Sequence, residues 1–154
     1  MRVEIDEKAE CEEIILRCPR MTPELEDLRA IAEGKGALQA HSVLPLSLGD
    51  ETYFVPLSEV LFFLSDGSRT AAHTEKALYY TDKKLYELEE ILPSRFFRVS
   101  KSCILNISEV QSMRKELSGI CEVKVGRGRF SVFVSRMYAK PFKERLFAFH
   151  DIEK

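Results

Sequence analysis

The sequence predicts a mainly β fold with a small N-terminal strand–helix extension and a C-terminal helix. Short apolar runs recur between turn signals, and Val60–Leu64 is a continuous apolar run typical of a central buried strand. The Gly-Arg-Gly-Arg segment at 126–129 separates two strand-like runs, which is the pattern of a β-hairpin. Helical signals are confined to three segments, which begin near Thr22, Asp82 and Ser135.

Residues 1–42 are predicted to form an extension, followed by the main domain at residues 43–154. Within the extension, Val3–Asp6 and Glu12–Leu16 are read as strands. Thr22, followed by Pro and Glu, is a typical helix N-cap. We expect the extension to cover a sheet edge or the flank of the domain, and a dimer or partner surface is the alternative. A receiver domain needs roughly a hundred residues, so the extension is too short for one.

Antiparallel strands joined by turns are predicted for most of the main domain. They lie within residues 37–48 and at 52–55, 60–64, 69–73, 76–81, 109–113, 120–125 and 130–134. A one-turn connector is expected at residues 56–59, before the buried strand. Asn106 follows two apolar residues, and we expect its side chain to bond neighbouring main-chain groups.

Two helices are predicted in the main domain. Asp82 is the expected N-cap of the first, its apolar stripe is Leu85, Leu88, Ile91 and Leu92, and Pro93 stops it. In the last segment, Tyr138, Phe142, Leu146 and Phe149 fall on one helical face. Pro141 interrupts that pattern unless the helix begins near Lys140, with the proline in its first turn.

The composition indicates a globular protein without a membrane span. The 154 residues are 45% hydrophobic, which supplies a core, and the apolar runs are far too short to cross a bilayer. No basic-then-apolar signal segment opens the chain, so we expect a cytoplasmic protein. The four cysteines form no C-x-x-C pair and no zinc spacing with histidine, so we expect buried free thiols and neither metal nor cofactor.

Charge is distributed unevenly along the chain. The formal net charge is −2, but residues 1–59 hold 6 Lys and Arg against 13 Asp and Glu. Between Arg95 and Arg145 there are 12 basic and 4 acidic residues. Because exposed charges more than about 10 Å apart are largely screened at 0.1 M salt, this local excess matters more than the total. It indicates an anionic partner for the C-terminal half.

Two polar runs in this basic half carry groups that suit DNA. Arg98, Ser100, Lys101 and Ser102 stand between apolar residues, and Ser135–Arg136 follows the strand at 130–134. Long cations can neutralise phosphates or donate to guanine, and short hydroxyls can donate to phosphate oxygens. The apolar flanks would hold both runs rigid. They predict the contact loops of a DNA-binding domain.

The two runs together resemble the LytTR family, a DNA-binding output domain of bacterial regulators. The matching residues are Phe97-Arg98, Ser102, Asn106, Ser135-Arg136 and Tyr138, with Leu57–Phe63 resembling the opening strand of the family. One departure is Ser100, where the family often has His. The resemblance implies an elongated, multi-stranded β fold whose loops enter successive major grooves. It also implies paired direct repeats in the DNA, a possible homodimer and a possible membrane-protein regulator.

The resemblance implies an expected role in DNA binding for each of several residues. Lys101 and Arg136 are expected to contact base edges, with Arg69 as a third contact. Ser100, Ser102 and Ser135 are expected to hold phosphates, helped by Arg98 and Lys140. An alternative for Arg98 is an ion pair with a buried carboxylate. The arginines of the 126–129 hairpin are further candidates for phosphate contact.

Two other classes of function remain as alternatives. The basic half could form an interaction module for an acidic partner or an anionic membrane surface. An enzyme is not expected, because the chain has no Gly-x-Ser-x-Gly, phosphate loop, His-Glu-x-x-His or carboxylate cluster. No small-molecule substrate is expected either. The favoured hypothesis is a sequence-specific regulator that binds duplex DNA.

Overall fold

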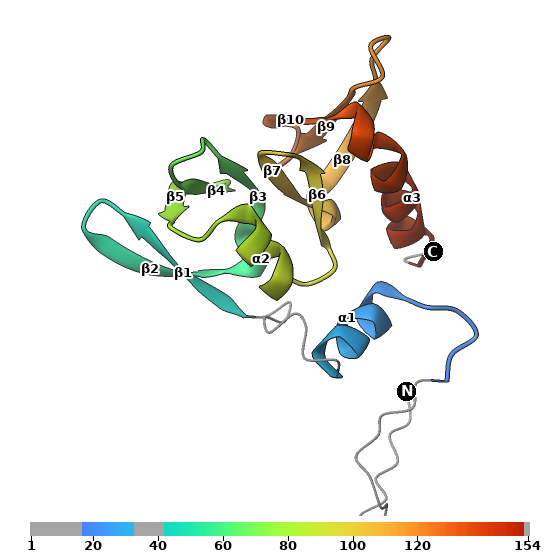
Figure 1. Ribbon diagram of the computed structural model, residues 1–154, viewed down its shortest axis with the longest axis horizontal. Helices are drawn as coiled ribbons and strands as arrows, with labels where there is room; N and C mark the ends of the chain where they lie inside the picture. The colour runs from blue at the N-terminus through green and yellow to red at the C-terminus, as the bar shows by residue number, and fades with distance from the viewer. Residues whose placement is uncertain (1–16, 33–41, 153–154) are drawn as a thin grey trace, which may run out of the picture.

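The computed structural model describes residues 17–32 and 42–152, so the predicted strands at 3–6 and 12–16 lie outside the described residues. The observed fold is mainly β with a long C-terminal helix, which confirms the predicted class (Figure 1). The helices are α1 (Pro23–Ala32), α2 (Leu85–Ile91) and α3 (Arg136–Ile152), with single 3₁₀ turns at Leu57–Glu59 and Ile107–Glu109. The strands are β1 (Val43–Leu48), β2 (Glu51–Pro56), β3 (Val60–Ser65), β4 (Thr70–Thr74), β5 (Leu78–Thr81), β6 (Phe96–Ser100), β7 (Cys103–Asn106), β8 (Val110–Lys115), β9 (Cys121–Val125) and β10 (Phe130–Val134).

The strands form two antiparallel sheets. The larger sheet has the order β2-β1-β5-β4-β3-β7-β6, and the smaller has the order β10-β9-β8. The predicted central strand is β3, which pairs with β4 on one side and β7 on the other. Figure 1 shows the β1–β2 hairpin extending from one end of the molecule and the smaller sheet with α3 at the other.

Alternation along the strands builds a separate core on each face of the large sheet. On β3, Phe63 packs with Leu85 and Leu88 of α2, while its neighbour Phe62 packs with the other core. That second core joins Val123 and Val134 of the small sheet to Phe142 and Leu146 of α3. The predicted apolar stripes of both helices therefore face these cores, and the large sheet lies between them.

Asn106 is the last residue of β7 and lies inside the core, where its side chain bonds main-chain groups as expected. Its side chain is fully buried, and the amide nitrogen donates to the Val60 carbonyl at 2.9 Å. The side-chain oxygen accepts from the backbone N–H of Ser108 at 3.2 Å and from the Ser108 hydroxyl at 2.6 Å. These bonds tie β7 to the start of β3 and to the 3₁₀ turn that follows.

The described part of the extension rests against the main domain. Thr22 caps α1, because its hydroxyl accepts a hydrogen bond of 3.3 Å from the Leu25 amide. Glu26 of α1 pairs with Arg145 of α3 at 2.8 Å. The same arginine donates to the Ser94 carbonyl at 3.1 Å. Whether the extension is a separate unit with a boundary at residue 42 stays a prediction.

Two helix starts differ from the prediction. Asp82 does not cap α2: the N-cap is Lys84, whose backbone N–H donates to the Glu87 carboxylate at 2.7 Å. α3 begins at Arg136 rather than near Lys140, so Pro141 stands inside the helix. Pro141 is exposed, and water can satisfy the carbonyl it leaves unpaired. Burial of the opposite helical face outweighs the cost of the proline.

Cys103 and Cys121 are buried free thiols, as predicted. Burial raises the pKa of the Cys103 thiol to about 12, so this thiol is neutral and unreactive at physiological pH. Cys11 lies outside the described residues. None of the described helices has the length and apolar character that a membrane span requires.

Candidate nucleic-acid interface

The turn between β3 and β4 carries Arg69 and is organised by Asp66. The Asp66 carboxylate accepts hydrogen bonds from the backbone N–H groups of Arg69 at 3.1 Å and Ser68 at 2.9 Å. These bonds, with a third from the Ser68 hydroxyl, lower the pKa of Asp66 to about 2. The exposed Arg69 guanidinium lies 3.8 Å from the centre of the Tyr80 ring. The turn is rigid at its base and presents a cation at its surface.

The turn between β6 and β7 carries Lys101 and Ser102, and both side chains are exposed. A β-bulge at Val99 shifts the register just before the turn. The Ser102 amide donates to the Ser100 hydroxyl at 3.2 Å, and the two hydroxyls lie 3.4 Å apart. Bulges commonly re-aim a side chain at the end of a strand. Here the bulge precedes the residue expected to contact bases.

Arg136 opens α3 directly after β10. Its aliphatic stem lies over the β8–β9 turn: a Cβ added to Gly119 would stand 3.3 Å from the Arg136 Cγ. Arg136 and Lys140 are exposed one helical turn apart, and Ser135 is half-buried just before them. The N-terminus of a 17-residue helix directs free N–H groups and a positive dipole end toward this surface. Both features favour phosphate.

Two backbone hydrogen bonds hold these three segments side by side. The Ser65 amide donates to the Ser102 carbonyl at 2.8 Å, which joins the β3–β4 turn to the β6–β7 turn. The Ser135 amide donates to the Val99 carbonyl at 2.9 Å, which joins the start of α3 to β6. We call the exposed trio Arg69, Lys101 and Arg136 the cationic ridge. Lys101 stands between the other two in this chain of bonds.

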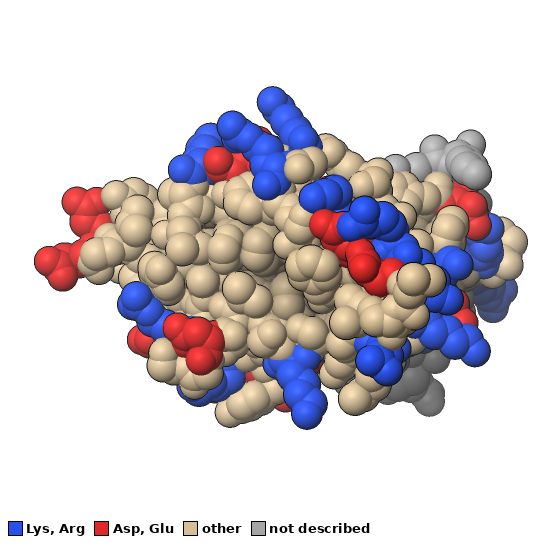
Figure 2. Space-filling view, turned by 90° about the horizontal axis from the view of Figure 1, so that it is seen from above, with Lys and Arg blue, Asp and Glu red and all other residues tan. Residues whose placement is uncertain are grey.

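Figure 2 looks onto the side of the molecule where these turns lie. Uncharged side chains cover the centre of this face, Lys and Arg side chains lie around its margins and toward the end away from the β1–β2 hairpin, and acidic side chains lie among them and at the hairpin end. That hairpin turn holds Asp50 and Glu51. The hairpin end of this face is therefore acidic, whereas basic and acidic side chains are mixed over the rest of it.

Arg98 lies behind the ridge and its guanidinium is engaged within the protein. Its Nε donates to the Ser100 carbonyl at 2.6 Å, and one terminal nitrogen donates to the Lys101 carbonyl. The other terminal nitrogen pairs with Glu89 of α2 at 3.0 Å. The Arg98 side chain is 20% exposed. The ion pair is the alternative considered from the sequence, although Glu89 is partly exposed rather than buried.

Lys83 and Lys84 extend the cationic surface, and the sequence interpretation missed them. The predicted helix capped by Asp82 would have included both lysines in its first turn, whereas α2 begins at Leu85. The Lys83 carbonyl accepts from the Thr70 hydroxyl at 2.9 Å, and the Lys84 Nζ lies 3.5 Å from the Ser68 carbonyl. Both lysines are exposed beside the Arg69 turn. The sequence feature that could have identified them is a pair of lysines between a predicted strand and a predicted helix.

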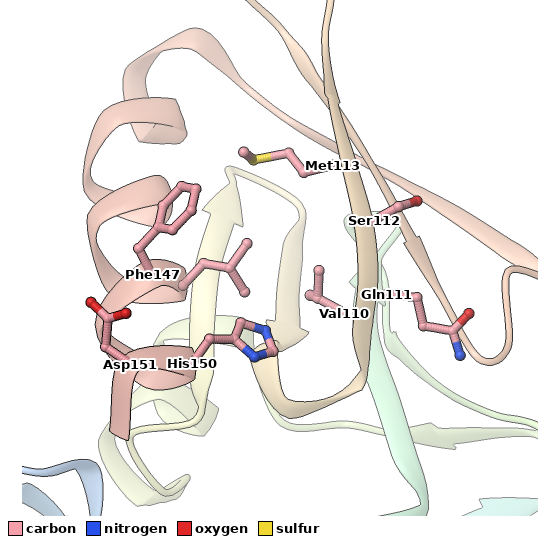
Figure 3. Close-up of a pocket in the computed structure, with 8 residues that line it drawn as sticks. Val110, Gln111, Ser112, Met113, Phe147, His150 and Asp151 are labelled. Carbon is pink, nitrogen blue, oxygen red and sulfur yellow. The ribbon is translucent and has the colours of Figure 1, made fainter. Parts of the chain in front are cut away.

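Two other features lie away from the ridge. The β9–β10 turn is at the opposite ends of its strands, where Arg127 lies 3.9 Å from Glu75. A groove of 390 Å³ runs between β8 and α3 (Figure 3). Val110 and Met113 point into it from the strand, and Phe147 and His150 come from the C-terminal half of the helix. Within residues 17–32 and 42–152, no group of His, Cys, Asp and Glu could hold a metal ion.

Comparison with known proteins identifies the family of this fold. The model of the LytTr DNA-binding domain family matches residues 50–147. A solved LytTr DNA-binding domain from Bacillus cereus has a TM-score of 0.64 and 26% identity, and covers 68% of this chain and 96% of its own. Uncharacterized HTH-type transcriptional regulators of Staphylococcus aureus strains NCTC 8325 and N315 are 27% and 28% identical over 133 residues, which is 86% of this chain and 88% of theirs.

Proposed function

This chain belongs to the LytTR family of DNA-binding domains, and we propose that it recognises specific duplex DNA through the cationic ridge. Its relatives include proteins named as transcriptional regulators, and the chain is a DNA-binding regulator. The family is not one of enzymes. The observation that carries the proposal is the pair of backbone bonds from Ser65 and Ser135. They unite three exposed cations from distant parts of the chain.

Each member of the ridge has a role in this proposal. Lys101 and Arg136 reach guanine O6 and N7 in the major groove, because long donors match that pair of acceptors. Arg69 contacts a third position, and its ring contact with Tyr80 limits the rotamers it can adopt. All three are presented by loops or a helix start, so recognition proceeds without a helix lying in the groove. Successive major grooves receive the separate loops.

Phosphate contacts fix the register of the protein on the duplex. We assign this role to the hydroxyls of Ser100, Ser102 and Ser135, and to Lys140 at the start of α3. The pair Lys83–Lys84 adds a contact on the far side of Arg69. Each cation that neutralises a phosphate releases counterions, so affinity will fall steeply with salt.

The wider assembly is proposed from the family resemblance and not from the ridge itself. The target is a pair of direct repeats, each bound by one copy, and the two copies form a homodimer on DNA. A membrane protein that restrains the regulator is the proposed source of its input. Because the chromosome is the target, the cytoplasm is the proposed location.

A binding series tests the proposal. A preferred duplex is first selected from a random pool, and then Lys101→Ala and Arg136→Ala are measured on it. Each should weaken binding by roughly 1–3 kcal/mol and relax preference at particular bases. Ser→Ala at the phosphate positions should weaken all sequences alike. The proposed site is wrong if both Ala variants keep the affinity and preference of the parent.

Matched controls lie at the opposite ends of the strands. Lys76 is in the β4–β5 turn, where it faces Glu59 at 3.8 Å, and Arg129 is in the β9–β10 turn. Lys76→Ala and Arg129→Ala remove the same charges as the test variants but should leave base preference unchanged. Binding to acidic vesicles in place of DNA would instead favour an interaction module for anionic surfaces.

A further inference from the structure

Arg98 is the cation of the motif that the structure engages most fully. Three of its five N–H donors, one on each nitrogen, bind the Ser100 carbonyl, the Lys101 carbonyl and the Glu89 carboxylate. A phosphate ligand needs donors directed outward, yet all three nitrogens of this guanidinium donate inward. The role of Arg98 therefore depends on the part of the protein that these hydrogen bonds hold in place.

The bonds hold the turn that carries Lys101. The β-bulge at Val99 interrupts the regular pairing of β6 with β7, and such interruptions leave main-chain groups in need of partners. Arg98 donates to the carbonyls of the two residues that follow the bulge. A planar fork can serve two carbonyls and a carboxylate in one fixed geometry, whereas an ammonium group cannot. The conformation of the turn is thereby coupled to Arg98.

Glu89 fixes the far side of the guanidinium. It belongs to α2, whose Leu85 and Leu88 are buried in the core behind the large sheet. The 3.0 Å ion pair therefore ties the turn, through Arg98, to a rigid element. We infer that Arg98 is a positioning residue, braced by Glu89, that sets the conformation in which Lys101 is presented to DNA. This inference rests on the proposed function, and it removes Arg98 from the expected phosphate contacts.

Arg98→Lys separates positioning from phosphate binding. Lysine keeps the charge and binds phosphate well as a point charge, so a phosphate ligand would tolerate the change. A positioning role predicts an about tenfold loss of preference for the selected duplex over a random duplex, because the fork is lost. The salt dependence of binding to random duplex should be unchanged. Parent-like preference in Arg98→Lys would overturn the inference.

Phosphate binding by Arg98 and positioning by Arg98 predict opposite effects of Glu89→Gln on DNA binding. If Arg98 were a phosphate ligand, releasing it from Glu89 would tighten binding to every duplex. If it positions the turn, preference for the selected duplex should fall about threefold, as expected when a partly exposed ion pair is removed. Glu90→Gln on the same helix removes the same charge outside the bridge and serves as the control. Tighter binding with unchanged preference in Glu89→Gln would refute positioning.

A measurement on the free protein keeps this inference separate from the proposed function. In Arg98→Lys, the amide signals of Lys101 and Ser102 should shift, and their order parameters should fall from about 0.85 toward 0.6. Unchanged signals would overturn the inference whatever the protein binds. If the signals change but the parent protein prefers no duplex, the positioning role stands and the proposed DNA recognition fails.

Discussion

The Ser65 amide donates a hydrogen bond of 2.8 Å to the Ser102 carbonyl, and this bond fastens two turns that are 37 positions apart in sequence. The last residue pair between β3 and β7 is Leu64 with Cys103, and the Ser65 bond follows directly after it. The bond therefore continues the sheet into the loops and transmits its rigidity to Arg69 and Lys101.

Asp66 provides the first prediction, since its carboxylate organises the Arg69 turn. Asp66→Ala removes the acceptor for the Ser68 and Arg69 amides, so Arg69 should become mobile and specific DNA binding should weaken. Asp66→Asn keeps one side-chain oxygen as acceptor and should retain most of the affinity. Titration of the selected duplex with both variants measures this. Equal losses in the two variants would show that charge, and not the turn, is responsible.

The lowered pKa of Asp66 gives a pH prediction. The folded-state pKa is about 2, below the ordinary value of 3.8, so the carboxylate stabilises the turn above pH 3.8. That stabilisation should be lost progressively as pH falls toward 2. Amide signals of Ser68 and Arg69, followed by NMR, should shift over this range. A midpoint near 3.8 would indicate that the carboxylate makes no such bonds in solution.

Gly119 provides a prediction about the support of Arg136. Its φ of +86° is unfavourable for an L side chain, and an added Cβ would meet the Arg136 Cγ at 3.3 Å. Gly119→Ala should lower the free energy of unfolding by about 1 kcal/mol and displace the Arg136 stem. Gly67→Ala, at φ +96° with open space around it, carries comparable backbone strain without that contact and is the control.

The two glycine variants should differ in DNA preference. Gly119→Ala should relax the same base positions as Arg136→Ala, whereas Gly67→Ala should leave those positions unchanged. Thermal unfolding measures stability, and selection from a random pool measures preference. Retained preference at the Arg136 positions in Gly119→Ala would show that the β8–β9 turn does not support this side chain.

Asn106 provides a stability prediction independent of DNA. Asn106→Ala leaves the Val60 carbonyl and the Ser108 amide without their buried partner. The free energy of unfolding should fall by about 2–3 kcal/mol in denaturant titrations. Ser108→Ala removes one bond at a more exposed position and should cost less. A loss below about 1 kcal/mol for Asn106→Ala would mean that water replaces these bonds.

Local sequence patterns were sufficient for most of the strands and for the central position of β3, but β6 (Phe96–Ser100) and β7 (Cys103–Asn106) were not among the predicted strands. A continuous apolar run such as 60–64 can be satisfied only where both faces of a strand are covered. The patterns were insufficient at Asp82 and Pro141, where capping and proline rules were overridden by tertiary packing of the helical faces. Local propensity is a weak guide to boundaries when burial decides where a helix begins.

The candidate site could be predicted only in part from the sequence, because long-range contacts bring its residues together. Residue type and spacing identified Lys101 and Arg136 as candidates, but their proximity depends on long-range backbone bonds from Ser65 and Ser135. The pair Lys83–Lys84 escaped notice because its assignment followed a misplaced helix start. The inward bonds of Arg98 depend on the bulge at Val99, which no local pattern indicates.

The relatives are named HTH-type regulators, yet the helices described in this chain are separated from one another by strands. No two of them, within residues 17–32 and 42–152, are consecutive as a helix-turn-helix motif requires. Recognition through loops of a β fold is the geometry that these residues offer. The proposed DNA contact through loops therefore differs from a contact made by a recognition helix.

The most direct test of the ridge is base-resolved selection of duplexes with Arg69→Ala, Lys101→Ala and Arg136→Ala. Because the Lys101 turn is bonded to the end of β3, and β6, which leads into that turn, is bonded to the start of α3, Lys101 lies between the other two segments on the ridge. The positions relaxed by Lys101→Ala should therefore fall between those relaxed by Arg69→Ala and those relaxed by Arg136→Ala. Relaxed positions in any other order, or no change in preference in all three variants, would contradict a single ridge that reads one duplex.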